Sequence, residues 1–120
     1  MEIPSIMKLE YSELDNGIRV LKLIGRLDMA GTNVINRQFV EHCAGENVFV
    51  LVDLSEVNYL SSIGIPMLIT SAKAITNHGG RMAFLTPQSS VKSILDITGV
   101  SNMIRIYKDL QTAKERLMLA

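Results

Sequence analysis

Two adjacent serines, Ser61 and Ser62, occupy the segment most suited to chemistry, because a glycine, a proline and an amphipathic stretch follow them. A hydroxyl just before a helix can cap it by accepting a hydrogen bond from a backbone N–H group. The same position favours negative charge, since the first N–H groups and the positive end of the helix dipole point toward it. Ser62 is therefore interpreted either as a helix cap or as a phosphorylation site, and its spacing leaves both open.

The apolar residues near Ser62 indicate what its phosphorylation would do. Ile63 and Met67 fall off the core-facing stripe predicted for the following helix, so we expect them at the surface beside the serine. A phosphate would add a charge of roughly −2 and three acceptor oxygens. The helix start would tolerate that charge, whereas a partner docked over Ile63 and Met67 would have to bury it. Phosphorylation of Ser62 would therefore act as a release signal that leaves the fold intact.

The other reactive side chains form no recognisable catalytic or metal site. His42 and Cys43 are adjacent and would point to different helix faces, and His78 stands alone, so joint metal ligation is geometrically poor. The sequence has no glycine-rich phosphate loop, nucleophile elbow or carboxylate pair suited to acid–base work. Cys43 falls on a core-facing stripe and is expected to be buried. We therefore expect no enzymatic activity, no metal and no cofactor.

Asp53 offers an alternative from a different class. It follows the apolar run 48–52, and phosphate-accepting receiver domains carry their aspartate at the end of a buried strand. Such a site also needs an acidic pair and a nearby lysine to hold Mg²⁺ and balance charge. Asp15, the available acid near the first strands, belongs instead to a predicted hairpin. Asp53 is expected to bond locally to Ser55, which disfavours the receiver interpretation.

The composition is that of one ordinary globular domain. The chain has 120 residues, of which 48% are apolar, and its 12 basic and 12 acidic residues cancel. General binding to nucleic acid or to an anionic membrane needs a basic excess, so neither is expected. No apolar run has the length of a membrane span, and the N-terminal segment MEIPSIMKLE lacks the features of a secretion signal. A single cysteine allows no internal disulfide. We expect a cytoplasmic protein, monomeric or weakly dimeric.

The apolar patterns predict a domain of the α/β class, with a loose lead-in at 1–7 and the folded domain at 8–120. Asn16 and Gly17 separate two extended runs, as in an antiparallel hairpin. The continuous apolar run 48–52 is typical of a parallel strand covered on both faces. The order of elements implies a small mixed sheet with packed helices. We expect strands at 8–14, 18–24, 48–52, 81–85 and 103–107. We expect one helix capped by Thr32 or Asn33, one that starts near Gly64, one capped by Ser89 or Ser90, and one capped by Asp109.

The expected topology brings two polar loops together. Two strands joined by a helix should run parallel, so the loops that follow them leave the same edge of the sheet. Asp28 and Ser62 belong to those two loops and are predicted to be neighbours. Because Pro66 would orphan a carbonyl if the helix began at Ser62, a start nearer Gly64 is favoured. The predicted core-facing stripe of this helix is Ile65, Leu68, Ile69, Ala72 and Ile75.

Three segments together resemble a STAS domain of the bacterial anti-sigma-factor antagonist type. They are GRLD at 25–28, VLVDLSEVNYLSSIGIPML at 50–68 and HGGRMAFLTPQSSVKSILDITGVSNMIRIYKD at 78–109. The resemblance extends from about Lys8 to Leu117. It implies a mixed sheet with helices packed mainly on one face, in agreement with the predicted order of elements.

The resemblance also implies partner switching. Members of this family bind an anti-sigma factor that is also a serine kinase, which frees the sigma factor. The kinase phosphorylates the serine two positions before the glycine, which ends binding, and a serine phosphatase restores it. That serine matches Ser62, and Ser61 stands where the family often has aspartate, which makes it a second, less favoured acceptor. The implied partner-binding residues are Asp28, Ser61, Ser62, Ile63, Gly64 and Met67.

A scaffold role is the main alternative within the same family. STAS domains also serve as subunits of signalling assemblies or of lipid-transport ATPases, in which the serine goes unmodified. Stable higher-order assembly, or co-purification with a membrane ATPase, would favour that role. A chain with no additional sensory or scaffold segment favours the regulated antagonist.

Overall fold

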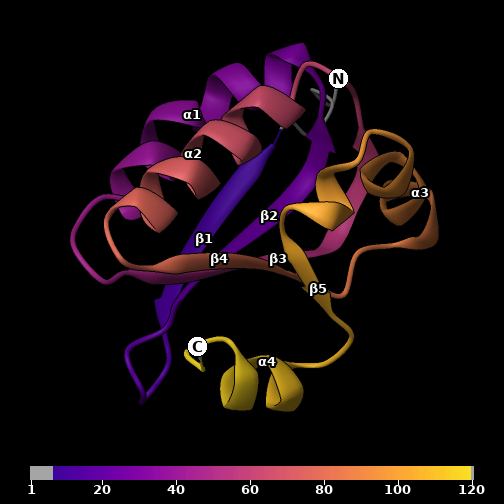
Figure 1. Ribbon diagram of the computed structural model, residues 1–120. Coiled ribbons are helices and arrows are strands. Elements are labelled where there is room, and N and C mark those ends of the chain that lie inside the picture. The colour runs from indigo at the N-terminus through magenta and orange to yellow at the C-terminus, as the bar shows by residue number, and fades with distance from the viewer. Residues whose placement is uncertain (1–6, 120) are drawn as a thin grey trace.

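The computed structural model describes residues 7–119. Their five strands form one sheet in the order β1-β2-β3-β4-β5 (Figure 1). The predicted order of strands and helices is confirmed. The elements are β1 (Lys8–Glu13), β2 (Arg19–Leu27), α1 (Met29–His42), β3 (Phe49–Leu60), α2 (Ile65–Asn77), β4 (Arg81–Leu85), α3 (Ser89–Ile97), the 3₁₀ helix η1 (Val100–Asn102), β5 (Arg105–Tyr107) and α4 (Leu110–Arg116).

The sheet is mixed because only its first pair of strands is antiparallel. β1 and β2 form the predicted hairpin, with Lys8 opposite Ile24 and Glu13 opposite Arg19. Its tight turn needs a glycine, since Gly17 has a φ of +90°. The pairs β2–β3, β3–β4 and β4–β5 are all parallel. The carboxyl ends of β2 and β3 therefore lie at one edge, as the crossover argument predicts.

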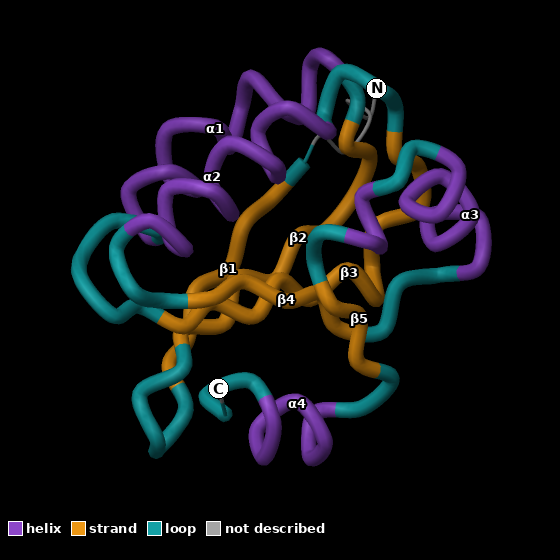
Figure 2. The backbone as a smooth tube through the Cα atoms, in the orientation of Figure 1, coloured by secondary structure: helices purple, strands orange, loops and turns teal. Residues whose placement is uncertain are grey.

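The helices are divided unequally between the two faces of the sheet. In Figure 2 the strands form a central layer with α1, α2 and α3 on one side and α4 on the other. The main hydrophobic core lies under the first three helices, and a smaller one lies under α4. The expected mixed sheet with helices mainly on one face is confirmed. The buried residues of the smaller core are Ile18, Val20, Leu51, Ala83, Leu85, Tyr107, Ala113 and Leu117.

Strand β3 is longer than the apolar run that predicts it. It continues past Asp53 to Leu60, so Asp53 lies within the strand and the predicted strand end is wrong. Pairing with β2 continues as far as Leu27 opposite Leu60, with register shifts along the way. Such irregularities break the alternation of buried and exposed residues by which a strand is recognised in a sequence.

Of the two helices that begin at the shared edge, α1 starts earlier than the sequence predicts and α2 starts where it is predicted. Helix α1 begins at Met29 with Asp28 as its N-cap, four residues before Thr32, the nearer of the two predicted caps. Helix α2 begins at Ile65, so Pro66 lies in its first turn, where a missing N–H costs nothing. The favoured start near Gly64 is confirmed.

The ends of the described chain add two observations. Met7, assigned to the lead-in by sequence, is buried in the main core, whereas residues 1–6 and Ala120 lie outside the described residues. At the final helix, Ala113 and Leu117 are buried, whereas Leu110 is 45% exposed. Within residues 7–119, no helix combines the length and the apolar character needed to cross a membrane.

Candidate functional site

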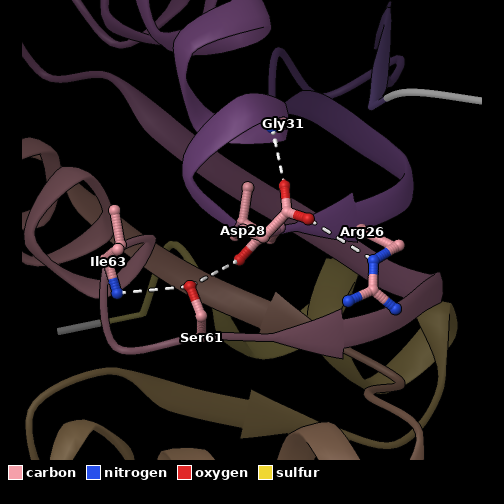
Figure 3. A network of polar contacts seen from close by, with 6 residues as sticks. Arg26, Asp28, Gly31, Ser61 and Ile63 are labelled. Carbon is pink, nitrogen blue, oxygen red and sulfur yellow. Dashed lines mark hydrogen bonds and ion pairs between the residues drawn. The ribbon is translucent and has the colours of Figure 1, made fainter.

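The loops that follow β2 and β3 are joined directly by hydrogen bonds. The Ser61 backbone N–H donates to the Leu27 carbonyl oxygen at 3.1 Å, and the Ser61 hydroxyl donates to the same oxygen at 3.4 Å (Figure 3). Leu27 ends β2 and lies opposite Leu60, which ends β3. The predicted proximity of the two polar loops is confirmed.

Asp28 holds a fixed negative charge on the first of these loops. Its Oδ1 accepts from the Gly31 backbone N–H at 2.9 Å and its Oδ2 accepts from Arg26 Nε at 3.4 Å. The Gly31 hydrogen bond, followed by the Arg26 guanidinium, lowers the pKa of Asp28 below its ordinary value. The carboxylate is therefore ionised at neutral pH, where it caps α1 and points toward Gly31 and Arg26 (Figure 3).

Arg26 is itself held in place from β3. Its guanidinium lies 4.2 Å from the centroid of the Tyr59 ring, in a cation–π contact between residues that face each other across the β2–β3 pair. Tyr59 is 42% exposed, so the pair forms part of the surface beside the two loops. The sequence analysis missed both residues, because their contact depends on the strand register.

The two adjacent serines have different environments. The Ser61 hydroxyl donates to Leu27 and accepts from the Ile63 backbone N–H at 3.3 Å, so it is engaged on both sides. Ser62 is exposed, and its hydroxyl forms no hydrogen bond with any residue from 7 to 119. The N-cap position of α2 is Gly64, so the interpretation of Ser62 as a helix cap is wrong. A modifying enzyme can reach the Ser62 hydroxyl without breaking a hydrogen bond between it and residues 7–119.

Exposed apolar side chains accompany the polar loops. Ile63, directly after Ser62, is 48% exposed, as expected for a contact surface. Met29, directly after Asp28, is 58% exposed, and the sequence analysis did not identify it. We call Asp28, Met29, Ser62 and Ile63 the loop surface. It combines one fixed negative charge, one free hydroxyl and two apolar side chains.

Two of the residues assigned to partner binding lie inside the fold. Met67 is only 7% exposed, so its expected place on the surface is wrong. Helix α2 packs against α1 as well as against the sheet, which makes its buried face wider than one stripe. Gly64 is also buried, and a Cβ atom there would lie 2.8 Å from Leu27 Cγ. Both residues therefore support the serine loop from inside the fold and are not part of its exposed surface.

An open groove of about 460 Å³ extends from the serine loop to α3. One wall is formed by Ser90 and Ile94 of α3 and by its C-cap Thr98, which are spaced four residues apart on one side of the helix. The opposite wall belongs to the end of β3. The sequence predicted α3 but gave no indication that this face borders the serines. The groove is lined by Asn58, Tyr59, Leu60, Ser61, Ser62, Ser90, Ile94 and Thr98.

Cys43 and Asp53 lie in environments unsuited to catalysis. Cys43 is buried as predicted, and burial raises the pKa of its thiol to about 12, so the reactive thiolate is scarce at neutral pH. Asp53 accepts from the Ser55 backbone N–H at 2.9 Å, which confirms the expected local bond. Because Asp53 lies within β3, the premise of the receiver interpretation, an aspartate at a strand end, is wrong.

The two histidines make separate local contacts. His42 stacks on Tyr11 with ring centroids 4.2 Å apart, and His78 Nδ1 lies 2.8 Å from a carboxylate oxygen of Glu46. Among residues 7–119, no three histidine, cysteine, aspartate or glutamate side chains gather as potential metal ligands.

A mixed five-stranded sheet, three helices on one face and two joined loops at the strand ends define a small α/β domain with a surface site. Residues 12–113 match the STAS domain family, and the chain belongs to that family. A putative anti-sigma factor antagonist of Thermotoga maritima is 29% identical over 73 residues, which are 61% of this chain. The match spans 64% of the length of that relative.

Solved structures share the fold. An anti-sigma factor antagonist from Mycobacterium paratuberculosis matches with a TM-score of 0.84, 19% identity and coverage of 98% of both chains. The anti-sigma factor antagonist SpoIIAA in its unphosphorylated form matches with a TM-score of 0.73 and 15% identity, over 91% of this chain and 95% of its own. SpoIIAA in its phosphorylated form gives a TM-score of 0.65 and 14% identity, over 91% of this chain and 98% of its own.

Proposed function

We propose that this protein is an anti-sigma factor antagonist that acts by partner switching in the cytoplasm. Its unphosphorylated form binds an anti-sigma factor that is also a serine kinase, and so releases a sigma factor. The kinase phosphorylates Ser62, which ends binding, and a serine phosphatase restores the binding form. The protein itself acts as a binding module and a kinase substrate, not as an enzyme. The family to which the chain belongs supports this proposal.

The observation that carries the proposal is the contrast between Ser62 and its surroundings. Its hydroxyl is exposed and unengaged among the described residues, while the loop that presents it is fixed by the Ser61–Leu27 hydrogen bonds. A modification site needs an accessible hydroxyl, and a docking site needs a backbone that is ordered before binding. Ser62 and its loop meet both requirements.

The same geometry supplies a mechanism of release. Phosphate on Ser62 would bring a charge of roughly −2 to a loop that neighbours the Asp28 carboxylate and carries the apolar Ile63. A partner seated on the loop surface would have to desolvate that charge without a compensating bond, which is strongly unfavourable. The fold keeps its contacts, because the Ser62 hydroxyl makes none with the described residues. Release therefore requires no large rearrangement.

A pull-down from lysate of the source organism, with partners identified by mass spectrometry, tests the proposal. The baits are wild type, Ser62→Ala, Ser62→Asp and a charge control, Ser12→Asp, which changes an exposed serine on β1. We expect wild type, Ser62→Ala and Ser12→Asp to retain an ATP-binding serine kinase and Ser62→Asp to lose it. The captured kinase, once purified, should transfer phosphate from ATP to wild type and not to Ser62→Ala.

Two outcomes would overturn the switching mechanism. One is capture of the same kinase by wild type and Ser62→Asp in equal amounts. The other is equal capture by both baits of a large assembly or a membrane ATPase, which would place the protein among the scaffold members of the family. In either case the exposure of Ser62 would have no regulatory meaning.

A further inference from the structure

Three arginines surround a pocket at the far end of the sheet from Ser62. Arg81 is the first residue of β4, Arg105 is the first residue of β5, and Arg116 is the last residue of α4. Side chains alternate along a strand, so Arg81 shares the face of Ala83, and Arg105 shares the face of Tyr107. Both of these belong to the smaller core, under α4. The pocket has a volume of about 350 Å³ and is lined by Arg81, Arg105, Tyr107, Arg116 and Leu119.

One of the arginines is fixed in the pocket wall by the chain itself. A terminal nitrogen of Arg81 donates to the Leu117 carbonyl oxygen at 3.0 Å and to the carbonyl oxygen of Leu119. These bonds hold the Arg81 guanidinium against the end of α4 without neutralising its charge. The positive charge of Arg81 is thus built into the pocket as part of the fold.

The other two guanidinium groups have no counterion in the described part of the chain. Arg105 and Arg116 are exposed, and neither forms an ion pair or a side-chain hydrogen bond with residues 7–119. Glu115, which precedes Arg116, accepts from Gln111 instead at 2.7 Å. A chain whose charges cancel in total therefore concentrates three positive charges in one place. Mutual repulsion disfavours such a cluster unless an anion joins it.

The number and chemistry of the three guanidinium groups indicate which kind of anion the pocket would bind. A carboxylate carries one charge and two oxygens, which a single arginine satisfies in bidentate fashion. A phosphate group carries a charge of about −1.5 to −2 and three acceptor oxygens, which matches several converging guanidinium groups. The pocket volume lies at the lower end of the range of about 300–1,000 Å³ found for small-molecule sites. We propose that the pocket of Arg81, Arg105 and Arg116 binds a small soluble phosphorylated molecule.

The site is separate from the loop surface. Arg81 lies opposite Phe49, at the start of β3, whereas the Ser62 loop follows Leu60 at the end of that strand. The twelve residues of β3 span roughly 35 Å at the usual rise of a strand. Binding of the phosphorylated molecule and phosphorylation of Ser62 can therefore be measured independently.

Titration calorimetry with inorganic pyrophosphate at low salt tests the proposal. The variants are Arg105→Gln and Arg116→Gln, which remove exposed groups without a described contact, and Arg116→Lys, which keeps the charge but loses the planar fork. The control is Arg37→Gln, which removes an equally positive and 91% exposed side chain that pairs with Glu41 on α1. We expect saturable binding by wild type, a loss of about tenfold or more in affinity for each pocket glutamine variant, and no change in the control.

Several results would overturn the proposal. They are no saturable binding by wild type, an equal loss in Arg37→Gln, and full affinity in Arg116→Gln. Amide chemical shifts of the wild type provide a readout that depends on no variant, and on titration they should change at residues 81–82 and 105–107. Shift changes spread over the whole surface would contradict a defined pocket. Sedimentation with phosphatidic acid vesicles but no response to pyrophosphate would also exclude a soluble ligand.

Discussion

The carbonyl oxygen of Leu27 accepts two hydrogen bonds from Ser61, one from the backbone at 3.1 Å and one from the hydroxyl at 3.4 Å. These bonds tie the end of β2 to the residue that follows β3. The two adjacent serines therefore have different roles. The Ser61 hydroxyl holds the loops together, and the Ser62 hydroxyl is left exposed on the loop so fixed.

Ser61→Ala should lower the melting temperature by about 4 °C, because it removes hydrogen bonds that together contribute about 1 kcal/mol. It should leave Ser62 a substrate of the captured kinase. Ser62→Ala should have the opposite effects, with an unchanged melting temperature and no phosphate incorporation. Thermal melts and mass spectrometry of the kinase-treated proteins measure both. Phosphate found on Ser61 in the wild type would reverse the assignment.

Met67 and Ile63 form a matched pair of apolar residues with different expected roles. Met67→Ala should lower the free energy of unfolding by about 2–4 kcal/mol, because it leaves a cavity in the main core. Ile63→Ala should change that free energy by less than about 0.5 kcal/mol, since the side chain is half exposed. Urea denaturation measures both values. Partner affinity, measured on the folded proteins, should fall in Ile63→Ala, and unchanged affinity would remove Ile63 from the interface.

Much of the fold was predictable because its signals are local. The Asn16–Gly17 pair gave the hairpin, and the short apolar run 81–85 gave β4 with its bounds. The proximity of the Asp28 and Ser62 loops followed from a topological rule that needs only the order of the elements. These features depend on near neighbours in the sequence or on connectivity.

The errors concern residues whose surroundings come from distant parts of the chain. Met67 is buried because α2 packs against α1 as well as the sheet, and helical periodicity carries no information on a second packing partner. The true length of β3 is obscured by register shifts opposite β2. The Arg26–Tyr59 contact and the α3 wall of the groove depend on strand register and helix placement. Asp28 replaced the predicted caps because α1 starts directly at the strand end.

Asp28→Asn should show what the charge of the α1 cap contributes. Asparagine keeps a side-chain acceptor at the cap but loses the charge that faces Arg26 and the helix dipole. The pKa of Asp28 is lowered in the fold, so its contribution to stability is fully present above the ordinary value of 3.8 and is lost as the pH falls through the folded value. The wild type should melt about 2–4 °C above Asp28→Asn at pH 7. The difference should shrink as the pH falls below 3.8, and a difference that does not change with pH would deny a role for ionisation.

Cys43 should resist alkylation in the native protein. Its pKa of about 12 makes the thiolate fraction at pH 8 roughly a thousandfold lower than that of an ordinary cysteine, and burial also blocks access. Iodoacetamide should therefore label the native chain very slowly and the urea-unfolded chain within minutes, as followed by intact mass. Rapid native labelling would place the thiol in a mobile or open region.

Gly64→Ala should disturb the serine loop by introducing a buried methyl group next to Leu27. The backbone of Gly64 is helical, so alanine causes no conformational strain, but its Cβ would lie 2.8 Å from Leu27 Cγ and 3.1 Å from the Leu27 carbonyl oxygen. That oxygen is the acceptor of both Ser61 bonds. We expect a loss of about 1–3 kcal/mol of stability. The Ser61–Leu27 hydrogen bonds should also weaken, which should lower partner affinity.

The cause of that loss can be isolated with a second change at the clashing residue. Leu27→Ala alone removes a buried side chain and should destabilise the fold through a cavity. In the double variant with Gly64→Ala, Leu27→Ala also removes the Cγ atom that the new methyl group would meet. The loss of stability in the double variant should therefore be smaller than the sum of the losses in the two single variants. Gly99→Ala is the control, because a Cβ there meets no atom within 4 Å and only the positive φ of 80° opposes it. Its cost should be independent of Leu27→Ala. Strictly additive losses for Gly64→Ala and Leu27→Ala would show that the cost at Gly64 does not come from contact with the Leu27 side chain.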